Sequence, residues 1–121
     1  MSRQVKQGDG WRVGWDPEAP VFQALLAGDC WSIELTAAEL NQFCRLAKQL
    51  AETMAQMSHQ LMESEKIACE AEGDLIWLEA EGYADAFALR FILLGRRRAE
   101  GGWPVEVVPQ LLQALTGLEV F

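Results

Sequence analysis

The chain has 121 residues, of which 50% are hydrophobic, and it carries a formal net charge of −8 at pH 7. This length and apolar content predict a single globular domain over residues 1–121 with one hydrophobic core. The acidic balance disfavours non-specific attraction to nucleic acid or anionic lipid. No apolar run approaches the roughly 20 residues that a membrane-spanning helix needs, so no membrane contact is expected.

Residues with metal-binding or nucleophilic chemistry are few. The cysteines Cys30, Cys44 and Cys69 are widely spaced and His59 is the single histidine, so one chain cannot assemble a Cys/His zinc site. The N-terminal segment lacks the apolar core of a secretory signal, which predicts reduced thiols and a cytoplasmic location. Nucleophile-elbow, Walker and dinucleotide-binding motifs are absent. We therefore expect a protein that is not an enzyme and that uses no cofactor or metal.

The first part of the chain reads as strands. Residues 1–9 are polar and are expected to be flexible, and residues 10–15 alternate like a weak strand. Residues 21–27 and 30–35 predict a hairpin with Gly28 and Asp29 as a two-residue turn. That turn pairs Ala27 with Cys30, and the pairs that follow on one face are all apolar: Leu26 with Trp31, Ala24 with Ile33, and Phe22 with Leu35.

Residues 36–64 predict one long amphipathic helix. Thr36 and Glu39 have the spacing of a capping box, and Leu35 and Leu40 have that of a hydrophobic staple. Apolar residues then recur in steps of three and four along a single face. The helix would be about 42 Å long, slightly longer than a domain of roughly 35 Å. We therefore expect its far end to lack cover within the chain: Met54, Met57, Leu61 and Met62.

Residues 66–72, 75–81 and 86–94 predict a three-stranded meander with a turn at Gly73 and Asp74. The predicted register keeps one face apolar, with Ala71, Ile76 and Phe91 side by side in one row. The opposite face has Glu70, Trp77 and Arg90 side by side. Two interpretations of this row remain open: a solvated face with good cross-strand pairs, or a ligand-binding face.

The last part of the chain begins with residues 95–102, which we expect to be a mobile basic loop. Trp103 and Pro104 then open a C-terminal helix that ends near Gly117. Taken in order, the elements predict an α+β protein. Its curved antiparallel sheet, in the order βββα-βββα, packs on one long helix, and a shorter helix follows at the C-terminus.

Three segments resemble a small cyanobacterial family that is known as a domain of unknown function, number 1818: GWRVGW at residues 10–15, WSIELT at residues 31–36 and RRRAEGGWP at residues 96–104. The resemblance covers nearly the whole chain and supplies no catalytic residues. It implies a cyanobacterial, cytoplasmic setting. It also implies a fold similar to the single-stranded-DNA-binding regulators of the Whirly and Pur-alpha type, or to cystatin-like proteins.

These features favour a non-enzymatic binding or assembly module. We expect it to form a homodimer through the Met54, Met57, Leu61 and Met62 end of the long helix, and to bind a protein partner whose identity the sequence does not give. One alternative is a single-stranded nucleic-acid-binding regulator that uses the sheet face and an anion contact at Arg96, Arg97 and Arg98. Another is a small-molecule enzyme with a pocket between sheet and helix.

Overall fold

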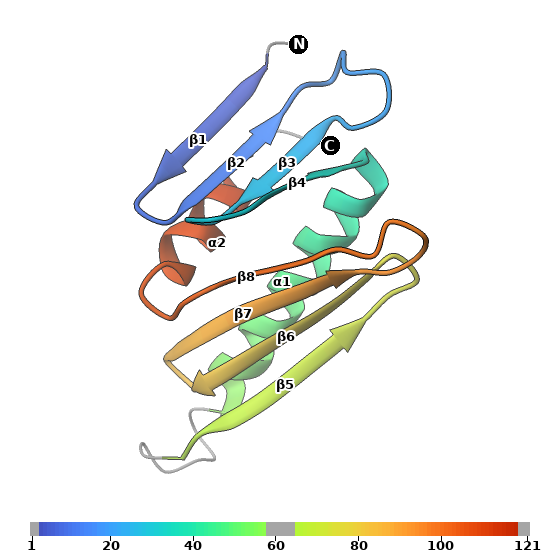
Figure 1. Ribbon diagram of the computed structural model, residues 1–121. Coiled ribbons are helices and arrows are strands. Elements are labelled where there is room, and N and C mark those ends of the chain that lie inside the picture. The colour runs from blue at the N-terminus through green and yellow to red at the C-terminus, as the bar shows by residue number, and fades with distance from the viewer. Residues whose placement is uncertain (1–2, 58–64, 119–121) are drawn as a thin grey trace.

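The structure is a computed structural model whose described residues are 3–57 and 65–118 (Figure 1). Its elements follow the order ββββα-ββββα. They are β1 (Gln4–Gly8), β2 (Trp11–Trp15), β3 (Ala24–Ala27), β4 (Ser32–Leu35), α1 (Ala37–Met57), β5 (Ile67–Glu72), β6 (Ile76–Tyr83), β7 (Ala86–Leu93), β8 (Glu100–Trp103) and α2 (Val108–Thr116).

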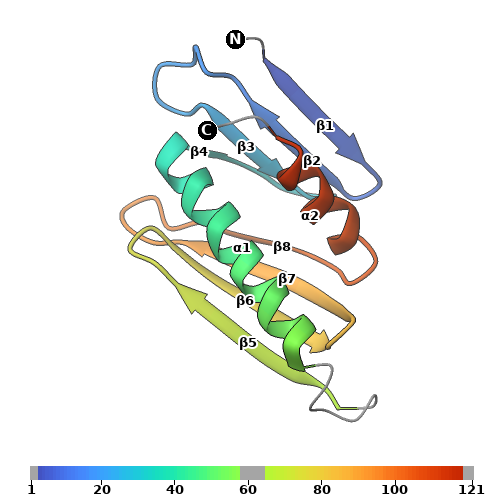
Figure 2. The same cartoon turned by 180° about the vertical axis from the view of Figure 1, so that it is seen from behind.

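The strands form two antiparallel four-stranded sheets, β1-β2-β3-β4 and β5-β6-β7-β8, which are not joined into one. Both helices lie on the same side of this strand layer (Figures 1 and 2). The long helix α1 follows the first sheet in the chain but packs mainly on β5 and β6 of the second, with a smaller contact to β4, whereas α2 packs on β2 of the first sheet and on β7 of the second. The long helix therefore mainly covers a sheet that the other half of the chain builds, and α2 bridges the two sheets. The predicted α+β class is confirmed.

The start of α1 has the predicted capping box. The Glu39 N–H donates to Thr36 Oγ1 (3.2 Å), and the Thr36 N–H donates to Glu39 Oε1 (2.8 Å). Leu35 and Leu40, the predicted staple, are both fully buried. The helix is described as far as Met57, and the predicted extension over residues 58–64 lies outside the described residues.

Two strands were missed by the sequence interpretation. Residues 4–8, expected to be flexible, form edge strand β1, and residues 100–103, expected to be a loop, form edge strand β8. Neither has the apolar alternation that predicts a strand; the pairing with β2 and with β7 forms them. In β8, Gly102 lies so close to β7 that an added Cβ would be 2.8 Å from the Leu89 carbonyl oxygen. The glycines therefore permit this strand rather than break it.

All three predicted hairpins are displaced in register by two residues. The Gly28 N–H donates to the Trp31 carbonyl (3.1 Å) and the Gly73 N–H to the Ile76 carbonyl (2.8 Å), so each glycine closes the strand pair instead of lying in the turn. The same shift pairs Tyr83 with Ala86. A two-residue shift keeps every side chain on its face because strand side chains alternate with period two. The predicted core face was therefore right although the pairs were wrong.

Tryptophans close the junction between the sheets, where β4 and β8 lie next to each other without a ladder of hydrogen bonds. Trp31 Nε1 donates to the Gly102 carbonyl of β8 (3.2 Å), and Trp103 Nε1 donates to the Ala27 carbonyl of β3 (3.0 Å). Phe43 of α1 and Phe91 of β7 complete the cluster, with ring centroids 5.1–5.9 Å apart. This reciprocal contact holds the two sheets together from inside.

Candidate functional site

The outer face of the second sheet carries most of the charge on the strand layer. Strand alternation turns apolar side chains of β5–β8 toward the helices and charged ones away from them. Five glutamates project on the outer side against one lysine and one arginine. We call this surface the acidic face: Lys66, Glu70, Glu72, Trp77, Glu79, Glu81, Arg90, Ile92 and Glu100.

Arg90 lies at the centre of the acidic face. Its guanidinium carbon is 4.9 Å from the centroid of the Trp77 ring, and its Nη2 is 3.3 Å from Glu79 Oε1. The predicted Arg90–Trp77 contact is therefore confirmed. The predicted row is not, because the two-residue register shift places Glu79, rather than Trp77, directly between Glu70 and Arg90. Trp77 reaches Arg90 diagonally.

A hollow of about 400 Å³ opens on this face between β6, β7 and β8. Small residues line it, among them Ala88 and Gly102, and Glu79, Glu81 and Glu100 contribute carboxylates. Glu100 joins the site only because β8 is a strand. It was not among the residues predicted for this face, because a loop was expected there.

Several carboxylates on the acidic face have no cation beside them. Lys66 Nζ lies 3.8 Å from Glu81, and Arg90 pairs with Glu79. Among the described residues, Glu70, Glu72 and Glu100 are exposed and form no ion pair. The face thus has an uncompensated negative charge, which suits a cationic partner and opposes a nucleic-acid backbone.

The arginine run that suggested an anion contact is divided between two environments. Arg97 Nη2 contacts Glu39, its Nη1 donates to the Glu34 carbonyl (2.7 Å), and its guanidinium carbon lies 4.7 Å from the Phe22 ring centroid. Arg96 and Arg98 are exposed. Arg97 therefore ties the β7–β8 connection to the capping box of α1, and the predicted anion contact at all three residues stays a prediction.

The methionine end of α1 is covered more fully than the sequence indicated. Met54 is fully buried, so the expectation that it lacks cover within the chain is wrong. Met57 is half-buried, and its Sδ lies 3.7 Å from Cys69 Sγ of β5. Strands β5 and β6 provide this cover because α1 lies along them. Leu61 and Met62 lie outside the described residues.

The described residues contain no group of three or more His, Cys, Asp or Glu side chains placed to hold a metal ion. Burial raises the pKa of the Cys44 thiol to about 11, which keeps it protonated and unreactive at neutral pH. His59 lies outside the described residues. No helix in the described part of the chain is long and apolar enough to span a membrane.

These features define an α+β protein of two open antiparallel sheets with both helices on one side and a charged outer sheet face. Over residues 6–118 the chain matches the family described as a domain of unknown function (DUF1818), and it belongs to that family. A similar fold is found in the crystal structure of a protein with unknown function from the DUF155 family from Prochlorococcus sp. NATL2A. That protein is 30% identical, with a TM-score of 0.87 over 96% of this chain and 97% of the other. No curated protein matches the chain.

Proposed function

We propose that this protein is a non-enzymatic binding module, that the acidic face is its binding surface, and that it associates with copies of itself. The observation that carries the proposal is the combination, on one sheet face, of carboxylates that form no ion pair within residues 3–57 and 65–118, an aromatic residue and a hollow. Both helices lie on the opposite side of the strand layer and leave this face open (Figures 1 and 2).

Binding fits this surface better than catalysis does. A carboxylic acid acts as a general acid when burial or a like charge keeps it protonated near neutral pH. Glu81 is exposed and its carboxylate lies 3.8 Å from Lys66 Nζ, while Glu79 lies 3.3 Å from Arg90 Nη2, so both carboxylates are arranged as ion pairs at the surface rather than buried in a cleft. The acidic face therefore offers fixed negative charges rather than a proton donor.

A cationic protein surface is the partner class that this face fits. Lysine and arginine side chains would pair with Glu70, Glu72 and Glu100, and apolar groups would pack on Trp77. Exposed ion pairs contribute about 0.2–1 kcal/mol each and are screened by salt, so we expect modest, salt-dependent affinity. The same charge disfavours the alternative of a nucleic-acid-binding regulator. The self-association expected from the sequence stays in the proposal, with its contact on the sheets rather than at Met54.

The test is an NMR titration with an arginine-rich peptide, compared with a glutamate-rich peptide of equal length. We expect saturable shifts of the Trp77 indole N–H and of the Gly101 and Gly102 amides with the first peptide only. Glu70→Lys should reduce the affinity, whereas Glu52→Lys on the exposed side of α1 should leave it unchanged. Absence of saturation, or equal shifts along α1, would show that the acidic face is not a binding surface.

A further inference from the structure

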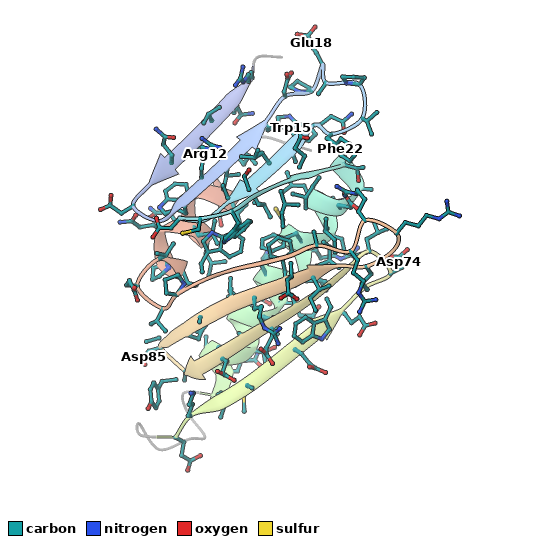
Figure 3. All side chains as sticks on the ribbon, viewed as in Figure 1. Arg12, Trp15, Glu18, Phe22, Asp74 and Asp85 are labelled. Carbon is teal, nitrogen blue, oxygen red and sulfur yellow. The ribbon has the colours of Figure 1, made fainter. Side chains whose placement is uncertain are left out.

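We infer that the partner of the acidic face is the outer face of the first sheet of a second copy of this chain, which presents two exposed arginines; the inference rests on the proposed function and names its partner. Arg3 and Arg12 project from that outer face and are exposed. Arg12 lies on β2, on the side away from both helices (Figure 3). Neither arginine forms an ion pair among the described residues.

The outer face of the first sheet has a notch at Gly14. The register places Val5, Gly14 and Leu25 side by side on three strands. Val5 is 51% exposed and Leu25 half-buried, so the bare glycine leaves a groove between two apolar walls. Here the fold does not require glycine, because an added Cβ would meet only Leu25 Cβ at 3.5 Å and the Gln4 carbonyl oxygen at 4.0 Å. A hollow of about 480 Å³ opens on this face.

The acidic face carries a short row of two apolar side chains, which we call the ridge. The register places Trp77 beside Ile92, with Glu72 next to Trp77 on one side and Glu100 next to Ile92 on the other. Both apolar side chains are half-buried, and both flanking carboxylates are exposed and unpaired among the described residues. The ridge therefore runs across the strands and has a negative charge at each end.

The spacings of the two charge pairs agree. Glu72 and Glu100 are three strands apart, which is about 14 Å at about 4.8 Å per strand. Arg3 lies opposite Asp16, four residues along β2 from Arg12, so the two arginines are separated by about 13 Å along the strand direction at about 3.3 Å per residue. A ridge that crosses strands meets a groove that follows a strand when two sheets pack at near right angles. In that arrangement each end of the ridge reaches one arginine.

Two other charges on the first sheet belong to this contact. Asp16 and Glu34 line the same hollow, so the first-sheet surface is close to neutral. Its attraction to the acidic face therefore depends on where its arginines lie rather than on its net charge. Because the contact relies on exposed ion pairs, which contribute little individually and are screened by salt, the association is weak and salt-sensitive. Each copy carries both surfaces, so the smallest product is a homodimer.

Analytical ultracentrifugation of the full chain from about 10 µM to about 500 µM tests the inference in the range expected for a small interface. The wild type should self-associate at low salt and dissociate as salt rises. Arg12→Glu should weaken association at least about tenfold, and so should the pair Glu72→Arg with Glu100→Arg, because each places like charges opposite each other. An equimolar mixture of these two variants should recover a 1:1 complex, since each retains the surface that the other has lost.

Two further variants serve as controls. One tests whether the shape of the notch at Gly14 matters, and the other tests whether a charge change elsewhere on the surface has the same effect. Gly14→Leu fills the notch without changing charge and should abolish association while melting like the wild type. Arg45→Glu, on the exposed side of α1, changes the same charge elsewhere and should associate like the wild type. A wild type that stays monomeric, an Arg12→Glu variant that still associates, or variants that do not recover on mixing would each overturn the inference. The peptide titration would still decide the proposed function in those cases.

Discussion

Replacing Arg97 with alanine is the sharpest test of how the arginine run is used. If this run were a free anion-binding loop, its three residues would be equivalent for stability. Instead, the Arg97 side chain contacts Glu39, donates to the Glu34 carbonyl at 2.7 Å and stacks on Phe22. We therefore expect Arg97→Ala to destabilise the fold, and Arg96→Ala and Arg98→Ala to change stability by less than about 0.5 kcal/mol.

The expected magnitude follows from these contacts. The Glu39 side chain is only 11% exposed, so removal of its cation leaves a largely buried carboxylate that still accepts the Thr36 N–H. A hydrogen bond to a charged group contributes about 1.5–3 kcal/mol, and an exposed cation–π contact about 0.5–1 kcal/mol. The Arg97 side chain is 37% exposed, which lowers the sum through solvent screening. We expect a loss of about 2–3 kcal/mol, or roughly 10 °C in Tm for a chain of this size.

Urea denaturation followed by tryptophan fluorescence measures this loss. A double-mutant cycle with Glu39→Gln isolates the pair, because glutamine can still complete the capping box while it removes the charge. The coupling between the two substitutions should exceed about 1 kcal/mol. An Arg97→Ala variant as stable as the wild type, or one no less stable than Arg96→Ala, would refute the assignment of a structural role to Arg97.

Three other outcomes are expected. Thr36→Ala removes the acceptor for the Glu39 N–H and should cost about 1 kcal/mol in thermal melts. Gln42→Leu leaves the Leu75 and Ile76 N–H groups without their acceptor and should cost about 2–4 kcal/mol. The Gln42 hydrogen bond holds the pKa of Asp74 below its ordinary 3.8. The stability that the ionised Asp74 contributes to the fold is therefore present above pH 3.8 and is lost as the pH falls through the lowered pKa. NMR titration of Gln42→Leu should show the Asp74 pKa raised. Fluorescence polarisation at about 150 mM salt should show no submicromolar binding to single-stranded oligonucleotides, because the acidic face repels phosphates.

Local chemistry predicted the start of α1 because the signal and its effect lie within four residues. The capping box needs only Thr36 and Glu39 to face each other's backbone, which any helix starting there provides. The sequence also predicted the core face of the strands in the predicted hairpins, since alternation alone determines which side is buried. These are the features that do not depend on distant parts of the chain.

The hairpin registers failed because the turn signal does not show which side chain packs on each glycine, and at the second turn that side chain is distant in the sequence. A Gly-Asp pair between two strands is a turn signal, and nothing nearby shows that each glycine serves another purpose. An added Cβ at Gly28 would be 2.4 Å from Trp31 Nε1, and one at Gly73 would be 2.3 Å from the Gln42 amide. Gln42 lies on α1, more than thirty residues before the turn that it caps. No local pattern can reveal such a contact.

Strand β8 and the cover over Met54 could not be predicted for a related reason. Both depend on packing between distant parts of the chain: α1 lies along β5 and β6, which bury Met54, while Gly101 of β8 lies directly under the Trp31 ring. The prediction of a bare helix end assumed that one twisted sheet could not follow α1 to its far end. Because β5 and β6 run along that end of α1, helix length does not indicate an exposed end here.

The packing of both helices on one side of the strand layer also determines where a partner can bind. The apolar stripe of α1 is buried mainly against the second sheet and that of α2 against β2 and β7, so the inner faces of both sheets are buried. Trp31 and Trp103 close the junction between β4 and β8 from within. What the described residues leave open is the outer side of the strand layer, and there the unpaired carboxylates and arginines lie on different sheets. A contact that matches them must therefore bring the second sheet of one molecule onto the first sheet of another, because within one chain the two outer faces point the same way.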